Sequence, residues 1–316
     1  MSDALLDIEN LVVRFGAVQA VSDVTFEVRK SETLGLVGES GCGKSSTARA
    51  VMQLPRPTSG EVRLAGQNLV ALKGSDLRQL RPKIQMIFQD PISSLNPRRT
   101  VLDIVSAPLE VVGKGSKAER KQIVHDMLEA VGLDPDLAMG RRPHEFSGGQ
   151  CQRISIARAL VLEPEVLICD EPVSALDVSV QAQILNLLQD MKERYGLTIL
   201  FISHDLAVVK NISDRVAVMY LGKICEVAPS ELLYKKPAHP YTVALLSAVP
   251  VPDPTAELKK VALIAGDLPS PTSPPSGCRF RTRCPYAQAK CAEDEPPLVE
   301  LAPNHQVACH FPLIDN

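Results

Sequence analysis

Three features are missing from this sequence: a long hydrophobic run, an excess of positive charge and an export signal. No apolar run approaches the roughly 18 residues that span a membrane, and no basic region followed by an apolar stretch opens the chain. A formal net charge of -3 gives no basic field for a nucleic-acid backbone. We therefore expect a soluble, cytoplasmic protein with no nucleic-acid partner. Its eight cysteines are then expected to be thiols or metal ligands, because disulfides belong mainly to exported proteins.

The hydrophobic pattern predicts an α/β core. Alternating polar and apolar residues at 6–15, 24–30 and 60–69 favour a small antiparallel layer. Continuous apolar runs, separated by helical stretches such as 178–194, indicate strands that are buried on both faces. These runs are 166–170, 198–203 and 215–220.

A helical insertion is predicted over about 90–162, between the alternating strands and the continuous apolar strands. Its clearest helix covers 118–131, where five apolar residues fall on one face. These residues are Ile123, Val124, Met127, Leu128 and Val131.

The composition changes at residue 237. Of the 25 prolines, 14 lie in the last 80 residues, where they would interrupt helices and central strands. We therefore divide the chain into a core domain, 1–236, and a largely irregular C-terminal extension, 237–316, that is rich in cysteine and proline.

The stretch "GESGCGKS" at 38–45 fits the phosphate-binding pattern G-x-x-x-x-G-K-S and lies between a predicted strand and helix. Glycines let successive backbone N–H groups turn toward an anion, and the helix N-terminus adds its dipole. A plain glycine-rich turn is the alternative interpretation. The residues expected to contact nucleotide here are Gly38, Ser40, Gly41, Gly43, Lys44, Ser45 and Ser46, with Ser45 also binding magnesium.

A second motif, "VLICDE" at 166–171, ends an apolar strand in two carboxylates. Asp170 is placed to hold magnesium, and Glu171 can polarise the water that attacks ATP. Two adjacent carboxylates at a strand end could instead cap the next helix. Together the two motifs predict ATP hydrolysis.

The stretch "FSGGQCQRISIARAL" at 146–160 makes the chain resemble the ATP-binding subunits of ABC transporters, with Phe146 in place of the usual leucine. The resemblance implies a P-loop fold of ABC type, with a mixed-sheet core, an antiparallel β subdomain and a helical subdomain. It covers nearly all of 1–235. The other matching positions are Phe15 for adenine stacking, Gln89 of the Q-loop, Asp177 of the D-loop and the switch histidine His204.

In this family two nucleotide-binding domains face head to tail and sandwich each ATP. The resemblance implies that Ser147, Gly148, Gly149 and Gln150 contact the nucleotide bound by the partner subunit. Gln89 would join Ser45 and Asp170 as a magnesium ligand, and His204 would act beside Glu171 at the γ-phosphate. Taken alone, Gln89 could be a polar strand end and His204 a residue beside a helix cap.

A narrower resemblance lies in "QDPISSLNPRRTV" (89–101), "HPYTVALLSAVPVPDP" (239–254) and the cysteine tail. These segments are similar to the dipeptide and oligopeptide importer branch, which also includes nickel, glutathione and oligosaccharide importers. The resemblance implies a second ATP-binding subunit, two transmembrane permeases and an extracytoplasmic substrate-binding protein as partners. It places the chain peripherally on the cytoplasmic face of the plasma or inner membrane.

Four cysteines of the extension, Cys278, Cys284, Cys291 and Cys309, fit neither zinc-ribbon pairs nor common ferredoxin spacings. The branch resemblance implies a 4Fe-4S cluster. Structural zinc and free thiols remain alternatives, and the arginines 279, 281 and 283 either offset an anionic cluster or are simply solvated. Because the extension lies outside every nucleotide motif, we expect ATP binding to be independent of it.

Two other classes of function are weighed against transport. Soluble ABC-type ATPases that act on DNA or ribosomes usually carry long coiled-coil insertions or two nucleotide-binding domains, which do not fit in 316 residues. If the chain were an iron-sulfur redox protein, its motifs for ATP hydrolysis would have no function. The sequence therefore favours an ATPase that drives import.

Overall fold

The computed structural model describes residues 4–248 and 266–313. The chain divides into two compact units, which are described separately. The helical unit comprises Arg29–Ser31 and Ala71–Leu200, and the sheet unit comprises 4–28, Glu32–Val70 and 201–313. The phosphate-binding stretch and the C-terminal extension therefore share one unit.

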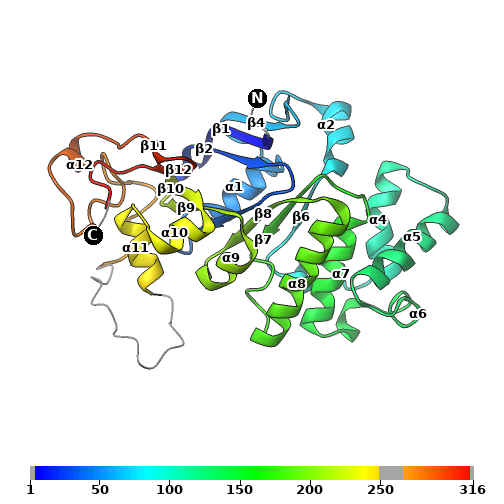
Figure 1. Cartoon of the computed structure of the whole chain (residues 1–316). Coiled ribbons are helices and arrows are strands. Elements are labelled where there is room, and N and C mark those ends of the chain that lie inside the picture. The colour runs from blue at the N-terminus through cyan, green and yellow to red at the C-terminus, as the bar shows by residue number, and fades with distance from the viewer. Residues whose placement is uncertain (1–3, 249–265, 314–316) are drawn as a thin grey trace. The chain divides into compact units, whose positions relative to one another are not determined.

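The helical unit contains a bundle in which α4, α5 and α7 pack together (Figure 1). Its two complete strands pair in parallel, with Ile84 opposite Val166. The strands are β6 (Ile84–Ile87) and β7 (Val166–Asp170). The helices are α2 (Gly74–Leu80), α3 (Pro91–Ser94), α4 (Val101–Val112), α5 (Lys117–Ala130), α6 (Pro135–Ala138), α7 (Gly148–Leu160) and α8 (Val178–Tyr195), with 3-10 turns η1 (Arg81–Lys83) and η2 (Pro143–Glu145).

Local sequence explains where the bundle helices begin. In α5, the Ser116 hydroxyl accepts the Glu119 N–H, and the Glu119 carboxylate accepts the Ser116 N–H at 2.7 Å. Thr100 and Asp103 form the same capping box at α4. The predicted apolar face of α5 is confirmed: Ile123 is half-buried and the other four residues are buried.

The sheet unit contains the predicted antiparallel layer, a four-stranded sheet in the order β2-β1-β4-β5. Leu6 lies opposite Leu64 where β1 and β4 pair. The strands are β1 (Ala4–Phe15), β2 (Val18–Arg29), β4 (Ser59–Leu64) and β5 (Gln67–Asn68).

A second sheet of the sheet unit has the order β11-β12-β10-β9-β3. β3 pairs in parallel with β9, whereas β10 pairs antiparallel with β9. Every residue of β3 and β9 is buried, and for β9 this confirms the apolar run predicted at 215–220. The strands are β3 (Thr33–Val37), β9 (Arg215–Tyr220), β10 (Lys223–Pro229), β11 (Val299–Ala302) and β12 (His305–Val307). The fully buried β8 (Thr198–Ser203) starts in the helical unit and ends in the sheet unit.

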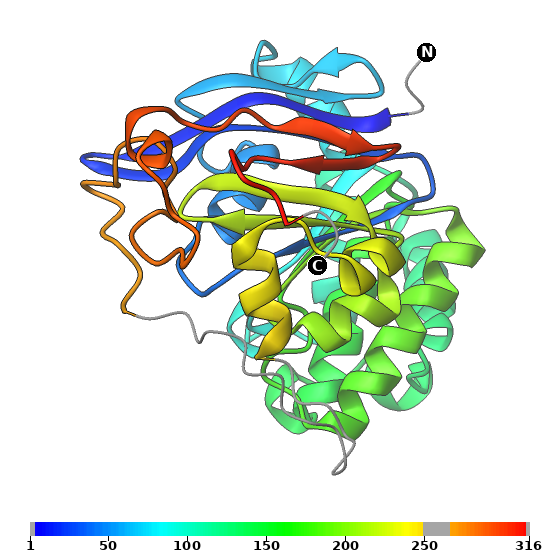
Figure 2. The ribbon, with the colours of Figure 1, turned by 60° about the vertical axis from the view of Figure 1, so that its left-hand side comes forward.

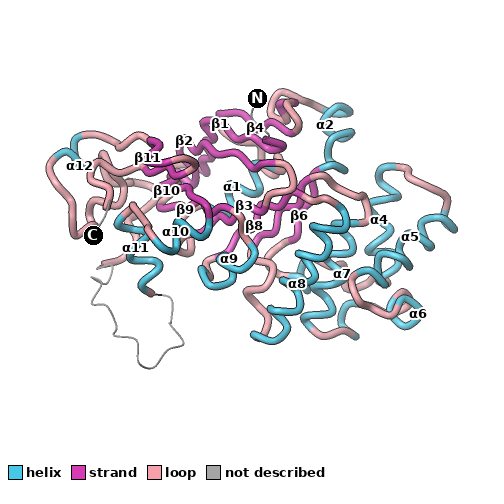
Figure 3. Tube along the Cα trace, in the orientation of Figure 1, coloured by secondary structure: helices cyan, strands magenta, loops and turns pink. Residues whose placement is uncertain are grey.

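The described part of the extension is mostly loop (Figure 3), with helices and strands at its ends. Sequence reasoning did not anticipate that its last strands join a sheet: β12 lies beside β10, with Glu226 opposite Val307 (Figure 2). The helices of the sheet unit are α1 (Lys44–Val51), α9 (Leu206–Ile212), α10 (Ser230–Lys235), α11 (Pro240–Ser247) and α12 (Lys290–Glu293). Within residues 4–248 and 266–313, no helix is both long and apolar enough to span a membrane.

Candidate nucleotide-binding site

The phosphate-binding loop, residues 38–45, connects β3 to α1 as predicted. Gly38 has φ +154°, and a Cβ there would lie 2.1 Å from the Met219 carbonyl oxygen. Gly43 has φ +110°, and its Cβ would lie 2.3 Å from the Ala20 carbonyl oxygen. Only glycine fits at these two positions, because a larger residue would collide with backbone and be strained.

Lys44 is the central cation of the loop. Its side chain is buried, and Nζ donates to the carbonyl oxygens of Gly38 at 2.8 Å and Glu39 at 3.0 Å. Ser45 and Ser46 lie half-buried in the first turn of α1, and Ser40 and Gly41 are exposed on the loop. A fixed ammonium beside a helix N-terminus is suited to binding phosphate oxygens.

Two further residues predicted for this site lie in the same unit. Phe15 ends β1 with 48% of its surface exposed, which leaves a ring available for stacking. His204 is exposed between β8 and α9. Asp205, the next residue, caps α9 by accepting the N–H groups of Ala207 and Val208.

In the helical unit the structure brings together two of the predicted catalytic residues. Gln89 Nε2 donates to Glu171 Oε2 at 3.0 Å. Asp170 is fully buried at the end of β7. Glu171 follows with φ +48°, a left-handed conformation that is uncommon for residues other than glycine. The two carboxylates therefore lie at a strand end, as the sequence predicted.

The signature residues begin α7 in the same unit. Ser147 is the N-cap, and it forms a capping box in which its N–H donates to Gln150 Oε1 at 2.9 Å. A Cβ at Gly149 would lie 2.5 Å from Val180 Cγ1 of α8, so a larger residue here would force the Val180 side chain to move. The helix N-terminus expected at Ser147–Gly149 is therefore present, with its N–H groups and dipole.

Asp177 caps α8. Its Oδ1 accepts the Val180 N–H at 3.0 Å and the Ser179 hydroxyl at 2.7 Å. These hydrogen bonds, that from the Ser179 hydroxyl first, lower the pKa of the Asp177 carboxyl. The carboxylate therefore remains charged at the start of the helix.

Sequence reasoning missed one contact of the phosphate-binding loop. The N–H of Glu39 donates to Tyr241 Oη at 2.9 Å, and Tyr241 is fully buried in α11. The segment around Tyr241 was recognisable only as a marker of the importer branch. A hydroxyl that binds a backbone N–H 202 positions earlier leaves no signal in a single sequence.

The four cysteines of the extension line one cavity, the extension cavity. Burial raises the pKa of the Cys278 and Cys284 thiols, and it raises that of Cys309 to about 11. The backbone N–H group two positions later, that of Phe280, Tyr286 or Phe311, partly offsets the rise in pKa in each case. Across 4–248 and 266–313, no three or more His, Cys, Asp or Glu side chains are placed to hold a metal ion.

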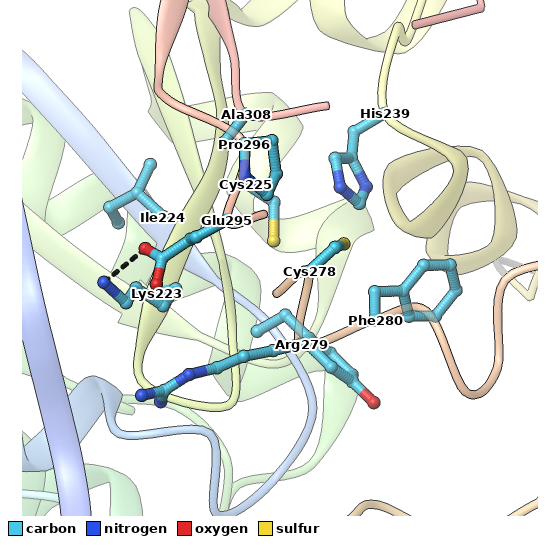
Figure 4. A pocket seen from close by; sticks show the side chains of 11 residues that line it. Lys223, Ile224, Cys225, His239, Cys278, Arg279, Phe280, Glu295, Pro296 and Ala308 are labelled. Atoms are coloured by element: carbon cyan, nitrogen blue, oxygen red, sulfur yellow. Dashed lines mark ion pairs between the residues drawn. The ribbon is translucent and has the colours of Figure 1, made fainter. Parts of the chain in front are cut away.

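A fifth cysteine lies near this set. Figure 4 shows Cys225 and Cys278 pointing into a neighbouring cavity that His239 and Phe280 also line. Cys225 is buried on β10, and burial, followed by the nearby Cys278, raises the pKa of its thiol well above the usual range. Sequence reasoning missed this proximity.

Comparison with known proteins gives two family matches. Residues 21–174 match the ABC transporter model, and residues 225–291 match the model of the oligopeptide/dipeptide transporter C-terminal region. The chain is 54% identical to the putative oligopeptide transport ATP-binding protein YkfD of Bacillus subtilis, over 97% of this chain and 95% of that protein. It is 54% identical to the oligopeptide transport ATP-binding protein OppF of Salmonella typhimurium, over 92% and 87%.

The fold has solved counterparts as well. A bacterial ABC transporter cassette, solved as a dimer, matches with a TM-score of 0.65 and 28% identity, over 71% of this chain and 98% of that one. The phosphate-binding loop, the carboxylate strand end and these matches together define an ATPase of ABC type. Because the relatives match along almost their whole length, the chain belongs to the oligopeptide/dipeptide branch of the ABC transporter ATP-binding proteins.

Proposed function

We propose that this chain is the ATP-hydrolysing subunit that powers import of dipeptides and oligopeptides. The observation that carries the proposal is identity of 54% to oligopeptide transport ATP-binding proteins, over 97% and 92% of this chain in the two cases. The coverage includes the C-terminal extension, which has its own family match. Nickel, glutathione and oligosaccharide importers share the branch and are the alternatives that the transport assay must separate.

The partners follow from the incomplete site. The N–H groups at the start of α7 serve a nucleotide bound by another ATP-binding subunit, and the related cassette was solved as a dimer. We propose a dimer of ATP-binding subunits that docks, at the cytoplasmic face of the membrane, on two permease subunits. A separate substrate-binding protein would deliver the peptide from outside.

For hydrolysis we assign roles by residue. Lys44 and the N–H groups of Gly38–Ser46 bind the ATP phosphates, Phe15 stacks on adenine, and His204 hydrogen-bonds the γ-phosphate. Glu171 accepts a proton from the attacking water, and Gln89 holds its carboxylate at 3.0 Å in the present arrangement. Ser45, Gln89 and Asp170 would hold magnesium, which neutralises charge on the β- and γ-phosphates.

The assignment is tested by Glu171→Gln in the assembled importer. Loss of the base should lower steady-state hydrolysis by about 100-fold or more, while MgATP binding stays within a few fold. Proteoliposomes should import a labelled tripeptide with the wild-type subunit and none with the variant. Hydrolysis that stays near the wild-type rate would refute the role of Glu171, whereas uptake of only nickel, glutathione or an oligosaccharide would refute the peptide substrate.

We further propose that 1–236 is the ATPase domain, with 90–162 as its helical insertion, and that the extension from 237 binds a 4Fe-4S cluster. Two points support this proposal: the four cysteines line one cavity, and four thiolates are the ligand set that such a cluster needs. Besides the cysteines, the ionisable side chains in that lining are those of His239, Arg281, Tyr286 and His310. Binding a cluster would deprotonate the thiols and draw the sulfurs together, which stabilises the extension.

Metal analysis tests this proposal. Chain purified without oxygen should contain about four irons and about four acid-labile sulfides, as a 4Fe-4S cluster held by four cysteine thiolates requires. Replacing Cys278, Cys284, Cys291 or Cys309 by serine should bleach the visible absorbance. Cys151 and Cys169, buried in α7 and β7, provide matched controls that should retain it. Stoichiometric zinc without sulfide, or no metal at all, would contradict the cluster.

A further inference from the structure

The C-terminal extension contacts the phosphate-binding loop through an ion pair. Arg283 Nη1 donates to both carboxylate oxygens of Glu39, at 2.9 and 3.2 Å. The side chains are 9% and 25% exposed, so water screens the pair only partly. The same nitrogen donates to Tyr220 Oη at 3.3 Å, which holds the guanidinium over β9.

Residues of the extension also hold the backbone of Glu39. Its N–H donates to Tyr241 Oη at 2.9 Å. The Tyr241 ring packs against Tyr220 with centroids 4.7 Å apart and against Phe280 with centroids 5.3 Å apart. Phe280 is 2% exposed and belongs to the same short segment as Arg283. Residues beyond position 236 thus fix both the side chain and the backbone of Glu39.

Glu39 in turn contacts the loop cation. Its carbonyl oxygen accepts a hydrogen bond from Lys44 Nζ at 3.0 Å. One residue therefore links Arg283 and Tyr241 on one side to Lys44 on the other. Because the N–H, the carboxylate and the carbonyl of Glu39 are all engaged, displacing it must change the position of Lys44.

We infer that Arg283 and Tyr241 are positioning residues through which the extension sets the affinity of the phosphate-binding loop for MgATP. The inference rests on ATP binding and not on the transported solute or on a metal. Arg283 immediately precedes Cys284, so a chemical change at the extension cavity reaches the loop along this route. By linkage, MgATP binding must affect that cavity by the same factor.

This inference replaces the expectation that ATP binding is independent of the extension. The structure also distinguishes the arginines at 279, 281 and 283, which the sequence analysis treated together. Arg279 Nη2 contacts Gln19 Oε1 of β2 at 3.3 Å, and Arg283 contacts Glu39. Arg281 donates from Nε to the Ser276 carbonyl oxygen at 2.8 Å, within the extension itself. Arg281 is therefore a matched control for Arg283.

The experiment measures equilibrium MgATP binding by the full chain. Arg283→Met should weaken binding about tenfold or more, the scale of a lost hydrogen bond to a charged group. Arg281→Met should stay within about twofold, because its partner lies outside the loop. Tyr241→Phe removes only the hydroxyl and should weaken binding by about 2- to 10-fold. Arg283→Lys, which keeps the charge, should recover part of the loss.

A double-mutant cycle with Glu39→Gln distinguishes positioning from general destabilisation. If Arg283 acts through Glu39, adding Arg283→Met to Glu39→Gln should cost little further affinity. In the assembled ATPase, KM for MgATP should rise while kcat changes less. Equal affinities of the Arg283→Met and Arg281→Met chains, or fully additive losses in the cycle, would overturn the inference. Should Arg283→Met fail to fold, unchanged affinity in both Glu39→Gln and Tyr241→Phe would overturn it as well.

Discussion

The phosphate-binding loop and the extension cavity lie in the same unit but are built in different ways. The loop uses eight consecutive residues, and glycine sterics at Gly38 and Gly43 dictate its course. The cavity collects cysteines between 278 and 309, and its walls come from the start of α11, the loop at 278–286, α12 and the segment after β12. A contiguous site is encoded locally, whereas a dispersed one depends on the tertiary fold around it.

The chemistry of the two sites differs as well. The loop presents N–H groups and the ammonium of Lys44, which suit an anion without any change of protonation. In the cavity, burial raises the pKa of the Cys278, Cys284 and Cys309 thiols, so these three could become ligands only if a metal displaced their protons. The loop is thus arranged to bind an anion as it stands, whereas these thiols would have to lose their protons before they could bind a metal.

The largest expected effect tests whether the two sites are independent. Phe280→Ala should lower the free energy of unfolding by about 3–5 kcal/mol, because a nearly buried ring is lost. The ring packs against Tyr220, His239 and Tyr241, so MgATP binding should weaken too. Denaturant unfolding and MgATP titration measure the two effects. Tyr286→Ala, an aromatic that lines the same cavity but is 50% exposed, is the control.

Normal MgATP affinity in a Phe280→Ala chain of lowered stability would mean that the loop does not depend on the extension. The phosphate-binding loop and the extension cavity would then be independent of each other.

A second experiment measures how the stability of the extension depends on pH. Burial lowers the pKa of His239 to about 4, against the opposing charge of Glu226. The unfolded chain binds this proton at about pH 6.5, so the contribution is complete above 6.5 and is lost as the pH falls toward 4. The loss amounts to about 3 kcal/mol at full titration.

His239→Asn should remove this part of the acid sensitivity. Asparagine keeps an acceptor for the Tyr241 N–H, which His239 Nδ1 accepts at 3.0 Å at the start of α11, but it does not titrate. Denaturant unfolding of both chains between pH 7 and 4 gives the comparison. Parallel stability curves would show that His239 titrates alike in the folded and unfolded chains.

The smallest expected effect concerns the start of α7, which depends on the local sequence. Ser147→Ala removes the N-cap of α7 and should cost about 1 kcal/mol. Amide hydrogen exchange in the first turn of α7 should accelerate, whereas exchange in β12 should not change. Ser147→Thr, which retains a hydroxyl, is the control. If amide hydrogen exchange also accelerated in β12, the effect of the Ser147 substitution would not be local to the start of α7.

These differences explain what could be predicted from the sequence. The strand-loop-helix at 33–51 and the buried strand at 166–170 follow from spacing and glycine chemistry, and the structure confirms them. The helix start at Ser147 was suggested only by the family resemblance. The hydrogen bond between Gln89 and Glu171 joins motifs 82 positions apart, and sequence reasoning did not anticipate it. The contacts of Glu39 with Arg283 and Tyr241, and the pairing of β12 with β10, depend on how the extension folds back. No periodicity or motif reports such contacts.

The pairing of β12 with β10 has a consequence for solubility. In the sheet order, β10 has β9 on one side and β12 on the other, so removal of the extension would leave β10 as an open edge. Open edges are templates for pairing between molecules. The same removal would strip His305, 2.7 Å away, and the N–H groups of Ala238 and His239 from the fully buried carboxylate of Glu226. A chain shortened to its ATPase motifs should therefore aggregate even though every catalytic residue is retained.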